Sequence, residues 1–440
     1  MTQSTPITHA RVLRLAWPII LSNISVPLLG LSDTIVIGHL PDPAALGGVA
    51  LGAMIFNLAF WGFGFLRMGT TGLTAQALGA RDNEEVSAHL GRALLVALLI
   101  GCGLVALQWP IAYIAFGLLK GSPEVQAHGH AFYNIRIWSA PFTLINFALL
   151  GWFIGRQKAK TALALQLFMN LLNIALNLFF VLALGWGVKG VATGTLIAEI
   201  AAAALGLTLA WRMLDLSHWT RSRLLDTHEI TRMVALNRDI MLRTFCLIFA
   251  FAFFTAQGAR AGDVTLAANA VLGQFIAFSA FLLDAFCAAT ETLVGEAVGA
   301  RNRGNLTRII KLSCLWAGIT ALALTLFFFA AGPLLIDALT IAPDVRAAAR
   351  TYLPWAAMIP VLAVWCFLLD GIFIGATRSV EMRNAMALAL VTFLAAWWLL
   401  IEPFDNHGLW AALAIFYVAR SLTLLPFYGS IGRAASLTYR

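Results

Sequence analysis

Apolar residues gather into long runs along the whole chain, and short polar segments separate these runs. A helix needs about 20 predominantly apolar residues to cross the hydrocarbon core of a bilayer. Runs of this length recur throughout, and they predict an all-α integral membrane protein with twelve transmembrane helices. The alternating segments of about ten residues that a membrane β-barrel requires do not occur. The predicted spans are 12–37, 46–66, 93–117, 130–155, 161–184, 188–211, 240–260, 265–290, 309–337, 347–376, 384–401 and 408–428.

Composition and charge agree with this class. Of the 440 residues, 60% are hydrophobic and 11% charged, whereas soluble domains carry about 25% charged residues. With both termini in the cytoplasm, most of the 29 basic residues lie on the inner side, as the positive-inside rule requires. The net charge of +8 is therefore explained by basic residues that set the orientation of the helices in the membrane, and we expect no nucleic-acid partner. The exceptions on the outer side are Lys120, Arg136, Lys189, Arg260, Arg346 and Arg350.

An internal repeat divides the chain. The segment ALGARDNEEV at 77–86 matches AVGARNRGNL at 297–306, and FIG at 153–155 matches FIG at 373–375, both at an offset of 220. Duplication of six helices makes both copies enter the membrane in the same sense, as in transporters built from parallel repeats. We predict an N-lobe at 1–215, a cytoplasmic amphipathic linker at 216–238 and a C-lobe at 239–440.

Polar residues inside the spans point to a site. Four amides in the predicted span 161–184 fall on one helix face, because their spacing is i, i+4, i+7 and i+11. They either join helices by hydrogen bonds or form the wall of a water-filled substrate cavity, which we expect here. We place Asn146, Thr195 and Glu199 of neighbouring spans in the same cavity. The four amides are Gln166, Asn170, Asn173 and Asn177.

Asp33 is a carboxylate near the middle of the first span, and Pro18 and Pro27 weaken the same helix. An acid at that depth is a functional candidate by default, since a buried charge is costly. Burial also favours its protonated form, so it can exchange a proton near ordinary pH. The structural alternative is an ion pair with Arg136. We expect Asp33 to couple proton binding to bending of a helix hinged at the two prolines.

The second half contains its own acids. Asp284 lies in the span 265–290 and shares one helix face with Glu291, which directly follows that span, and Asp370 lies near the end of the span 347–376. For Asp284 and Asp370 we weigh a cation or proton site against structural pairing. The eight histidines fall in loops or at helix ends, so we expect them to be solvated or interfacial, with His39 a candidate for pH sensing on the outer side.

Several segments carry a family resemblance. In the first half these are SNISVPLLGLSDTIVIGHL at 22–40, GGVALG at 47–52, LRMGTTGLTAQALGA at 66–80 and LLGWFIGRQKAK at 149–160. In the second half they are LNRDIMLRT at 236–244, GAR at 258–260, LAANAVL at 266–272 and LLDGIFIGATRSVEMRN at 368–384. These segments resemble the multidrug and toxic compound extrusion (MATE) transporters, in particular the branch of DNA-damage-inducible protein F. The similarity covers nearly the whole chain in order.

The resemblance implies a V-shaped pair of lobes that alternate between outward- and inward-facing states in the bacterial inner membrane. It implies export of amphipathic, often cationic, compounds driven by H⁺ or Na⁺, with no cofactor, and we expect a monomer. In the family, the acid matching Asp33 is the main coupling residue, and a bend at the proline matching Pro18 accompanies its protonation. Positions matching Asn173 and Thr195 belong to the same network, and the acid matching Asp370 belongs to a cation site in another branch.

Asn177 departs from the family, since many relatives have an aspartate there. An amide cannot bind a proton, and hard cations prefer several oxygen ligands including charged ones. We therefore favour H⁺ over Na⁺. A flippase for lipid-linked precursors, in the same wider superfamily, is the alternative function, although it would be expected to show a basic central groove. An enzyme is not expected, because no zincin pair or intramembrane Ser/His arrangement is present.

Overall fold

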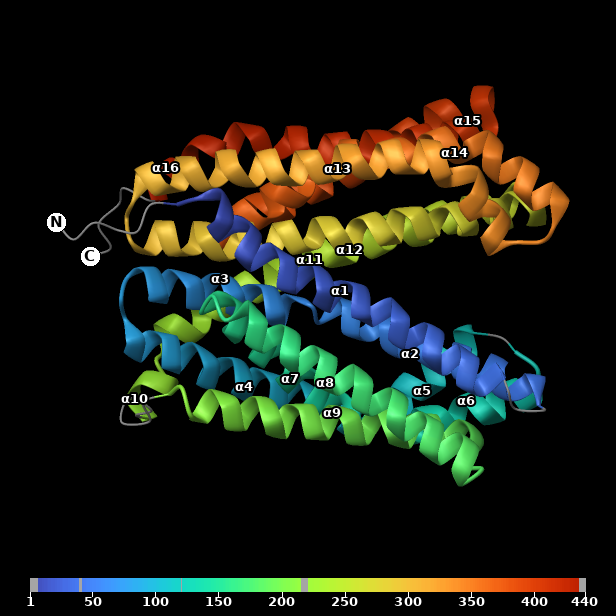
Figure 1. Cartoon of the computed structure of the whole chain (residues 1–440), viewed down its shortest axis with the longest axis horizontal. Coiled ribbons are helices and arrows are strands. Elements are labelled where there is room, and N and C mark those ends of the chain that lie inside the picture. The colour runs from blue at the N-terminus through green and yellow to red at the C-terminus, as the bar shows by residue number, and fades with distance from the viewer. Residues whose placement is uncertain (1–6, 39–41, 120, 215–220, 435–440) are drawn as a thin grey trace. The chain divides into compact units, whose positions relative to one another are not determined.

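The computed structural model describes residues 7–38, 42–119, 121–214 and 221–434, without the side chains of 28, 31–35, 37, 38, 221, 433 and 434. Its described part is all helical (Figure 1). The first half contains α1 (His9–Gly38), α2 (Pro43–Gly62), α3 (Phe65–Gly79), α4 (Asn83–Ala106), α5 (Gln108–Leu118), α6 (Pro123–Arg136), α7 (Ala140–Gly155), α8 (Ala159–Leu178) and α9 (Gly187–Trp211). The second half contains α10 (Arg221–Leu224), α11 (Thr227–Arg260), α12 (Asp263–Gly299), α13 (Arg303–Leu339), α14 (Pro343–Gly375), α15 (Ser379–Leu424) and α16 (Tyr428–Ala434).

Ten segments of the described residues are long and apolar enough to cross a membrane. The thirty-residue α1 covers the first predicted span and is not among these ten. Short breaks interrupt some predicted helices: the span 46–66 crosses a turn between α2 and α3, and a 3₁₀ turn at Ile137–Ser139 joins α6 to α7. Mid-helix 3₁₀ turns of this kind often mark strained or functional positions.

The longest of these segments, Ser379–Gly432, contains a reversal. Asp405 has φ 48°, in the left-handed region, and Pro403 lies two residues before it. The hydroxyl of Thr423 donates to the carbonyl of Ala385 at 3.3 Å, so the two arms of α15 run antiparallel side by side. This helical hairpin accommodates both predicted spans 384–401 and 408–428.

Contacts divide the chain into two compact units. One unit, here called the N-terminal unit, comprises Leu21–Leu78 and Asp82–Met233. The other, the C-terminal unit, comprises Met1–Ile20, Gly79–Arg81 and Val234–Arg440. The start of α1 thus packs with the C-terminal unit, where Arg11 bonds to Glu296 at 2.6 and 2.7 Å. The predicted limits of the lobes and linker remain a prediction.

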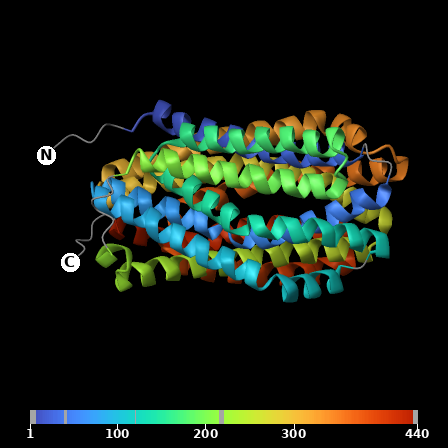
Figure 2. The same ribbon diagram turned by 90° about the horizontal axis from the view of Figure 1, so that it is seen from below.

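Within each unit the helices pack along one another's length (Figures 1 and 2). In the N-terminal unit α2 packs against α6, α4 against α7, and α8 against α9. In the C-terminal unit α12 packs against α13 and α14, and α14 packs against α15.

Part of the predicted linker belongs to α11. This helix begins at Thr227, because Asp226 accepts hydrogen bonds from the amides of His228 and Glu229 at 2.9 and 3.3 Å.

The repeat is visible in the packing. A Cβ on Gly151 would collide with the carbonyl of Arg67, and a Cβ on Gly371 would collide with that of Cys287. Both the glycines and their neighbours are related by the offset of 220. A second pair, Gly155 against Thr71 and Gly375 against Glu291, repeats the relation one turn later. Glycines four residues apart therefore let α7 approach α3, and α14 approach α12, at backbone distance.

Candidate functional site

The four amides of α8 lie together on one buried face, with between 0 and 8% of each residue exposed. Gln166 donates through Nε2 to Oδ1 of Asn170 at 3.0 Å, and Asn177 donates through Nδ2 to Oδ1 of Asn173 at 2.7 Å. Asn170 in turn donates through Nδ2 to the hydroxyl of Ser25 at 2.8 Å. The spacing along the sequence therefore predicted one polar face correctly, and its bonds connect α8 to α1.

The first helix runs unbroken through both of its prolines. Pro18 is buried and Pro27 is exposed. Pro18 lies beside the point, after Ile20, at which α1 passes from the C-terminal unit to the N-terminal unit. Asp33 belongs to α1, but its side chain lies outside the described residues, and so does His39. Their proposed roles remain predictions.

A buried ion pair forms a second polar group in the N-terminal unit. Glu199 accepts hydrogen bonds from Arg136 through Nη1 at 3.1 Å and Nη2 at 2.7 Å, and a further one from the hydroxyl of Thr143. The guanidinium carbon of Arg136 lies 5.3 and 5.5 Å from the ring centroids of Phe56 and Phe60. Arg136, which we considered as an alternative ion-pair partner for Asp33, is therefore paired with Glu199.

The amide face and the ion pair of Glu199 lie on different sides of α9. Gly194 is the position of α9 that packs against Asn177, because a Cβ there would collide with Oδ1 of that amide. Glu199 follows five residues later, about 140° around the helix. Asn146 bonds to the backbone carbonyl of Glu199 at 3.1 Å, and Thr195 donates to the carbonyl of Val191 in its own helix at 2.9 Å. The described contacts therefore form two separate polar groups, the amide face and an ion-pair cluster around Glu199, and the expected cavity itself remains a prediction.

Asp370 of α14 lies between two arginines in the C-terminal unit. Arg420 of α15 donates to its Oδ2 at 2.8 Å, and Arg243 of α11 donates to the same oxygen. All three residues are buried, with between 3 and 6% exposed. Of the two alternatives for Asp370, these contacts favour structural pairing, since both partners are present. Asp284 is half-buried on α12, and for this residue both a cation or proton site and structural pairing remain open predictions.

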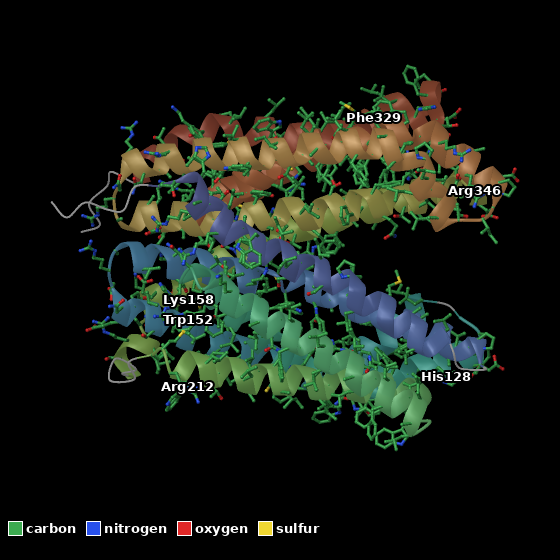
Figure 3. The ribbon with its side chains drawn as sticks, viewed as in Figure 1. His128, Trp152, Lys158, Arg212, Phe329 and Arg346 are labelled. Atoms are coloured by element: carbon green, nitrogen blue, oxygen red, sulfur yellow. The ribbon has the colours of Figure 1, made fainter. Side chains whose placement is uncertain are left out.

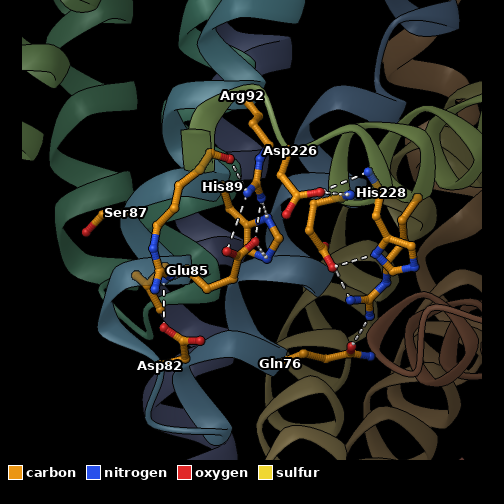
Figure 4. Close-up of polar contacts among 12 residues, drawn as sticks. Gln76, Asp82, Glu85, Ser87, His89, Arg92, Asp226 and His228 are labelled. Carbon is orange, nitrogen blue, oxygen red and sulfur yellow. Dashed lines mark hydrogen bonds and ion pairs between the residues drawn. The ribbon is translucent and has the colours of Figure 1, made fainter. Parts of the chain in front are cut away.

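Sequence reasoning missed a polar cluster where α4 begins (Figure 4). Arg92 bonds to Glu85 and, through Nη2, to the carbonyl of Arg223 at 2.7 Å. His89 lies between them on the same face and is 4% exposed, so the expectation that every histidine is solvated or interfacial was wrong. The spacing Glu85, His89, Arg92 is i, i+4, i+7, which was a detectable sign of one helix face.

Both halves of the chain match one family model, MatE, over residues 18–179 and 240–398. The chain belongs to the MatE family. It is 43% identical over 94% of its length to the DNA damage-inducible protein F of Escherichia coli strain K12, covering 90% of that protein. It is 27% identical over 89% of its length to the probable multidrug resistance protein NorM of Caulobacter vibrioides, covering 83% of that protein.

Solved structures share the fold of this MatE protein. One is a MOP superfamily transporter from Pyrococcus furiosus, with a TM-score of 0.87 at 19% identity, covering 98% of this chain and 97% of that one. Another is described as a MATE protein in the bent conformation, with a TM-score of 0.87 at 20% identity, covering 96% and 95%. The chain is therefore a multi-pass membrane protein of a transporter family with the predicted fold class.

Proposed function

We propose that this MatE protein is a secondary active exporter of the bacterial inner membrane. It exchanges amphipathic, often cationic, compounds for H⁺ by alternating access, and Asp33 is the main coupling carboxylate. Membership of a transporter family supports the general activity. The choice of coupling ion and the role of Asp33 rest on the chemistry of the N-terminal unit.

The hydrogen bond between Asn170 and Ser25 is the observation that carries this proposal. Three membrane-crossing segments separate α1 from α8, so the two helices run in the same direction. Position 33 lies eight residues beyond Ser25, about 12 Å along the helix axis. Asn177 lies seven residues beyond Asn170, about 11 Å along its own axis. Along the helix axes, position 33 of α1 is thus at about the height of Asn177 on α8.

Charge explains why an acid at that height suits coupling to H⁺. The amides of α8 donate and accept hydrogen bonds without carrying charge, so they tolerate both protonation states of a nearby carboxylate. Glu199 is engaged by Arg136 and Thr143, and Asn177 cannot ionise. A lone carboxylate binds one proton readily, whereas a Na⁺ site needs several oxygen ligands in fixed geometry.

The membrane potential can drive such an exchange. One proton that moves through a potential of 100 mV supplies about 2.3 kcal/mol for export of the substrate.

Reconstituted vesicles test the proposal. In the wild type, an imposed pH gradient should drive uptake of a cationic dye such as ethidium, and addition of the dye should release protons. Asp33→Asn should abolish both while the protein remains folded, because an amide cannot exchange the proton. Glu124→Gln, which removes an exposed acid from the first turn of α6, is the matched control and should retain both activities.

Separate ion gradients distinguish the coupling ions. A Na⁺ gradient at equal pH should drive no dye uptake, and its removal should leave transport driven by the pH gradient unchanged. Proton release by the Asp33→Asn variant would refute the role of Asp33. Transport that followed Na⁺ alone would refute H⁺ coupling, although the exporter function would stand.

A further inference from the structure

Three basic residues lie at one end of the N-terminal unit, where α7 and α9 end and α8 begins. Arg156 directly follows α7, Lys158 directly precedes α8, and Arg212 directly follows α9. Figure 3 shows Lys158 and Arg212 at the same end of the unit. We call these three residues the basic edge. Since they flank apolar spans, we expect them at the depth of lipid headgroups.

Arg156 is held in place rather than extended into water. Its guanidinium carbon lies 4.5 Å from the ring centroid of Trp152, and its Nη1 donates to the carbonyl of Met213 at 3.3 Å. Trp152 is itself fixed, because its indole nitrogen donates to the carbonyl of Val86 at 2.8 Å. The guanidinium therefore sits pre-organised between the end of α7 and the residue after Arg212, with N–H groups left for an acceptor.

Among the described residues, no carboxylate forms an ion pair with a member of the basic edge. Burial lowers the pKa of Arg156, because partial desolvation disfavours its charged form. An anion bound at the guanidinium would offset this cost. The repeat offers a contrast, since Arg378, which matches Lys158 at the offset of 220, has the carboxylate of Glu381 at 3.5 Å.

An apolar stripe leads away from the basic edge along α9. Ile200, Leu207 and Trp211 are spaced i, i+7 and i+11, so they share one face, and they are 38, 38 and 61% exposed. This face suits an acyl chain, and an exposed tryptophan is typical of the membrane interface. A soluble phosphate would use the cations and leave the stripe without a function.

We propose that the basic edge and the stripe on α9 form a binding site for an anionic phospholipid. The phosphate accepts hydrogen bonds from Arg156 and lies close to Lys158 and Arg212, and an acyl chain follows the stripe. Guanidinium groups suit phosphate oxygens because they present paired N–H donors. The site involves neither Asp33 nor the amide face, so it stands or falls independently of the proposed transport mechanism.

Native mass spectrometry of the purified full chain tests this site, with phosphatidylglycerol and phosphatidylcholine as probes. The wild type should retain phosphatidylglycerol preferentially. The triple variant Arg156→Gln, Lys158→Gln, Arg212→Gln should bind it at least tenfold more weakly, since each basic residue near an anionic surface contributes about a fivefold factor and three are removed. The control Arg303→Gln, Arg308→Gln, Lys311→Gln removes the same charge from exposed positions of α13 and should lose clearly less phosphatidylglycerol than the first triple variant, because it leaves Arg156 and the stripe on α9 intact.

Three results would overturn the proposal. Unchanged retention by the first triple variant would show that the basic edge binds no lipid. Equal losses in both triple variants would reduce the effect to general attraction between charges. Displacement of the lipid by millimolar inorganic phosphate would make this a soluble-anion site. The single variant Lys158→Gln changes only an exposed side chain, so a partial loss of phosphatidylglycerol there supports the proposal even if the triple variant fails to fold.

Discussion

Removing the charge of Glu199 tests whether its ion pair is structural. Glu199→Gln keeps the size of the side chain but leaves the guanidinium of Arg136, which is 9% exposed, without its anion. Three donor groups, two from Arg136 and one from Thr143, then face a neutral amide. The protein should be markedly destabilised, because a buried cation that has lost its partner cannot recover its hydration.

The expected size follows from the contacts. Breaking a buried ion pair costs about 3–5 kcal/mol. The rings of Phe56 and Phe60, both within 5.5 Å of the guanidinium carbon, offset on the order of 1 kcal/mol of this cost. We therefore expect Glu199→Gln to lower the free energy of unfolding by about 3 kcal/mol. The double variant Arg136→Met, Glu199→Leu removes both charges and should lie within about 1 kcal/mol of the wild type.

Reversible unfolding in mixed micelles, followed by tryptophan fluorescence, measures these free energies, and a double-mutant cycle isolates the pair. The pH dependence of dye uptake should be unchanged in whatever Glu199→Gln protein folds, because the pair is not the site of proton exchange. A coupling energy below about 0.5 kcal/mol would contradict the assigned pairing. A shifted pH optimum in a stable variant would instead make Glu199 a second coupling acid.

Two further substitutions probe packing and coupling. Gly151→Ala should destabilise the protein by about 1–3 kcal/mol, because the new Cβ collides with the carbonyl of Arg67; Gly103→Ala, with nothing within 4 Å, is the control and should be neutral or stabilising in the same unfolding assay. Asn177→Asp adds a carboxylate at the end of the amide face, which should shift the pH profile of dye uptake or introduce a response to Na⁺. An unchanged profile in vesicles would place Asn177 outside the coupling site.

Much of the site was predictable where its members lie in one helix. The four amides of α8 share a face because helical periodicity alone sets their relative angles. The same rule would have detected the face formed by Glu85, His89 and Arg92. It cannot say what such a face meets, so the bond from Asn170 to Ser25, which spans 145 positions, was invisible in the sequence.

Ionic partners were the main failure of sequence reasoning. Arg136 and Glu199 are 63 positions apart, and Arg243 and Asp370 are 127 apart. Each pair depends on which helices are neighbours and how each is rotated about its axis. Glu199 was expected beside the amides, but it faces about 140° away from the position of α9 that packs on Asn177.

The sequence by itself determined the all-α membrane class, the twofold repeat and the family, because apolar length, offset and motif order are properties of the chain read in one dimension. Tertiary structure alone decided that Glu199 belongs to Arg136, that Asp370 belongs to two arginines, and that Trp152 fixes Arg156. The physical reason is that charges in a poorly hydrated interior are stabilised by whichever opposite charges and dipoles lie within a few ångströms. Those distances exist only after the helices have packed.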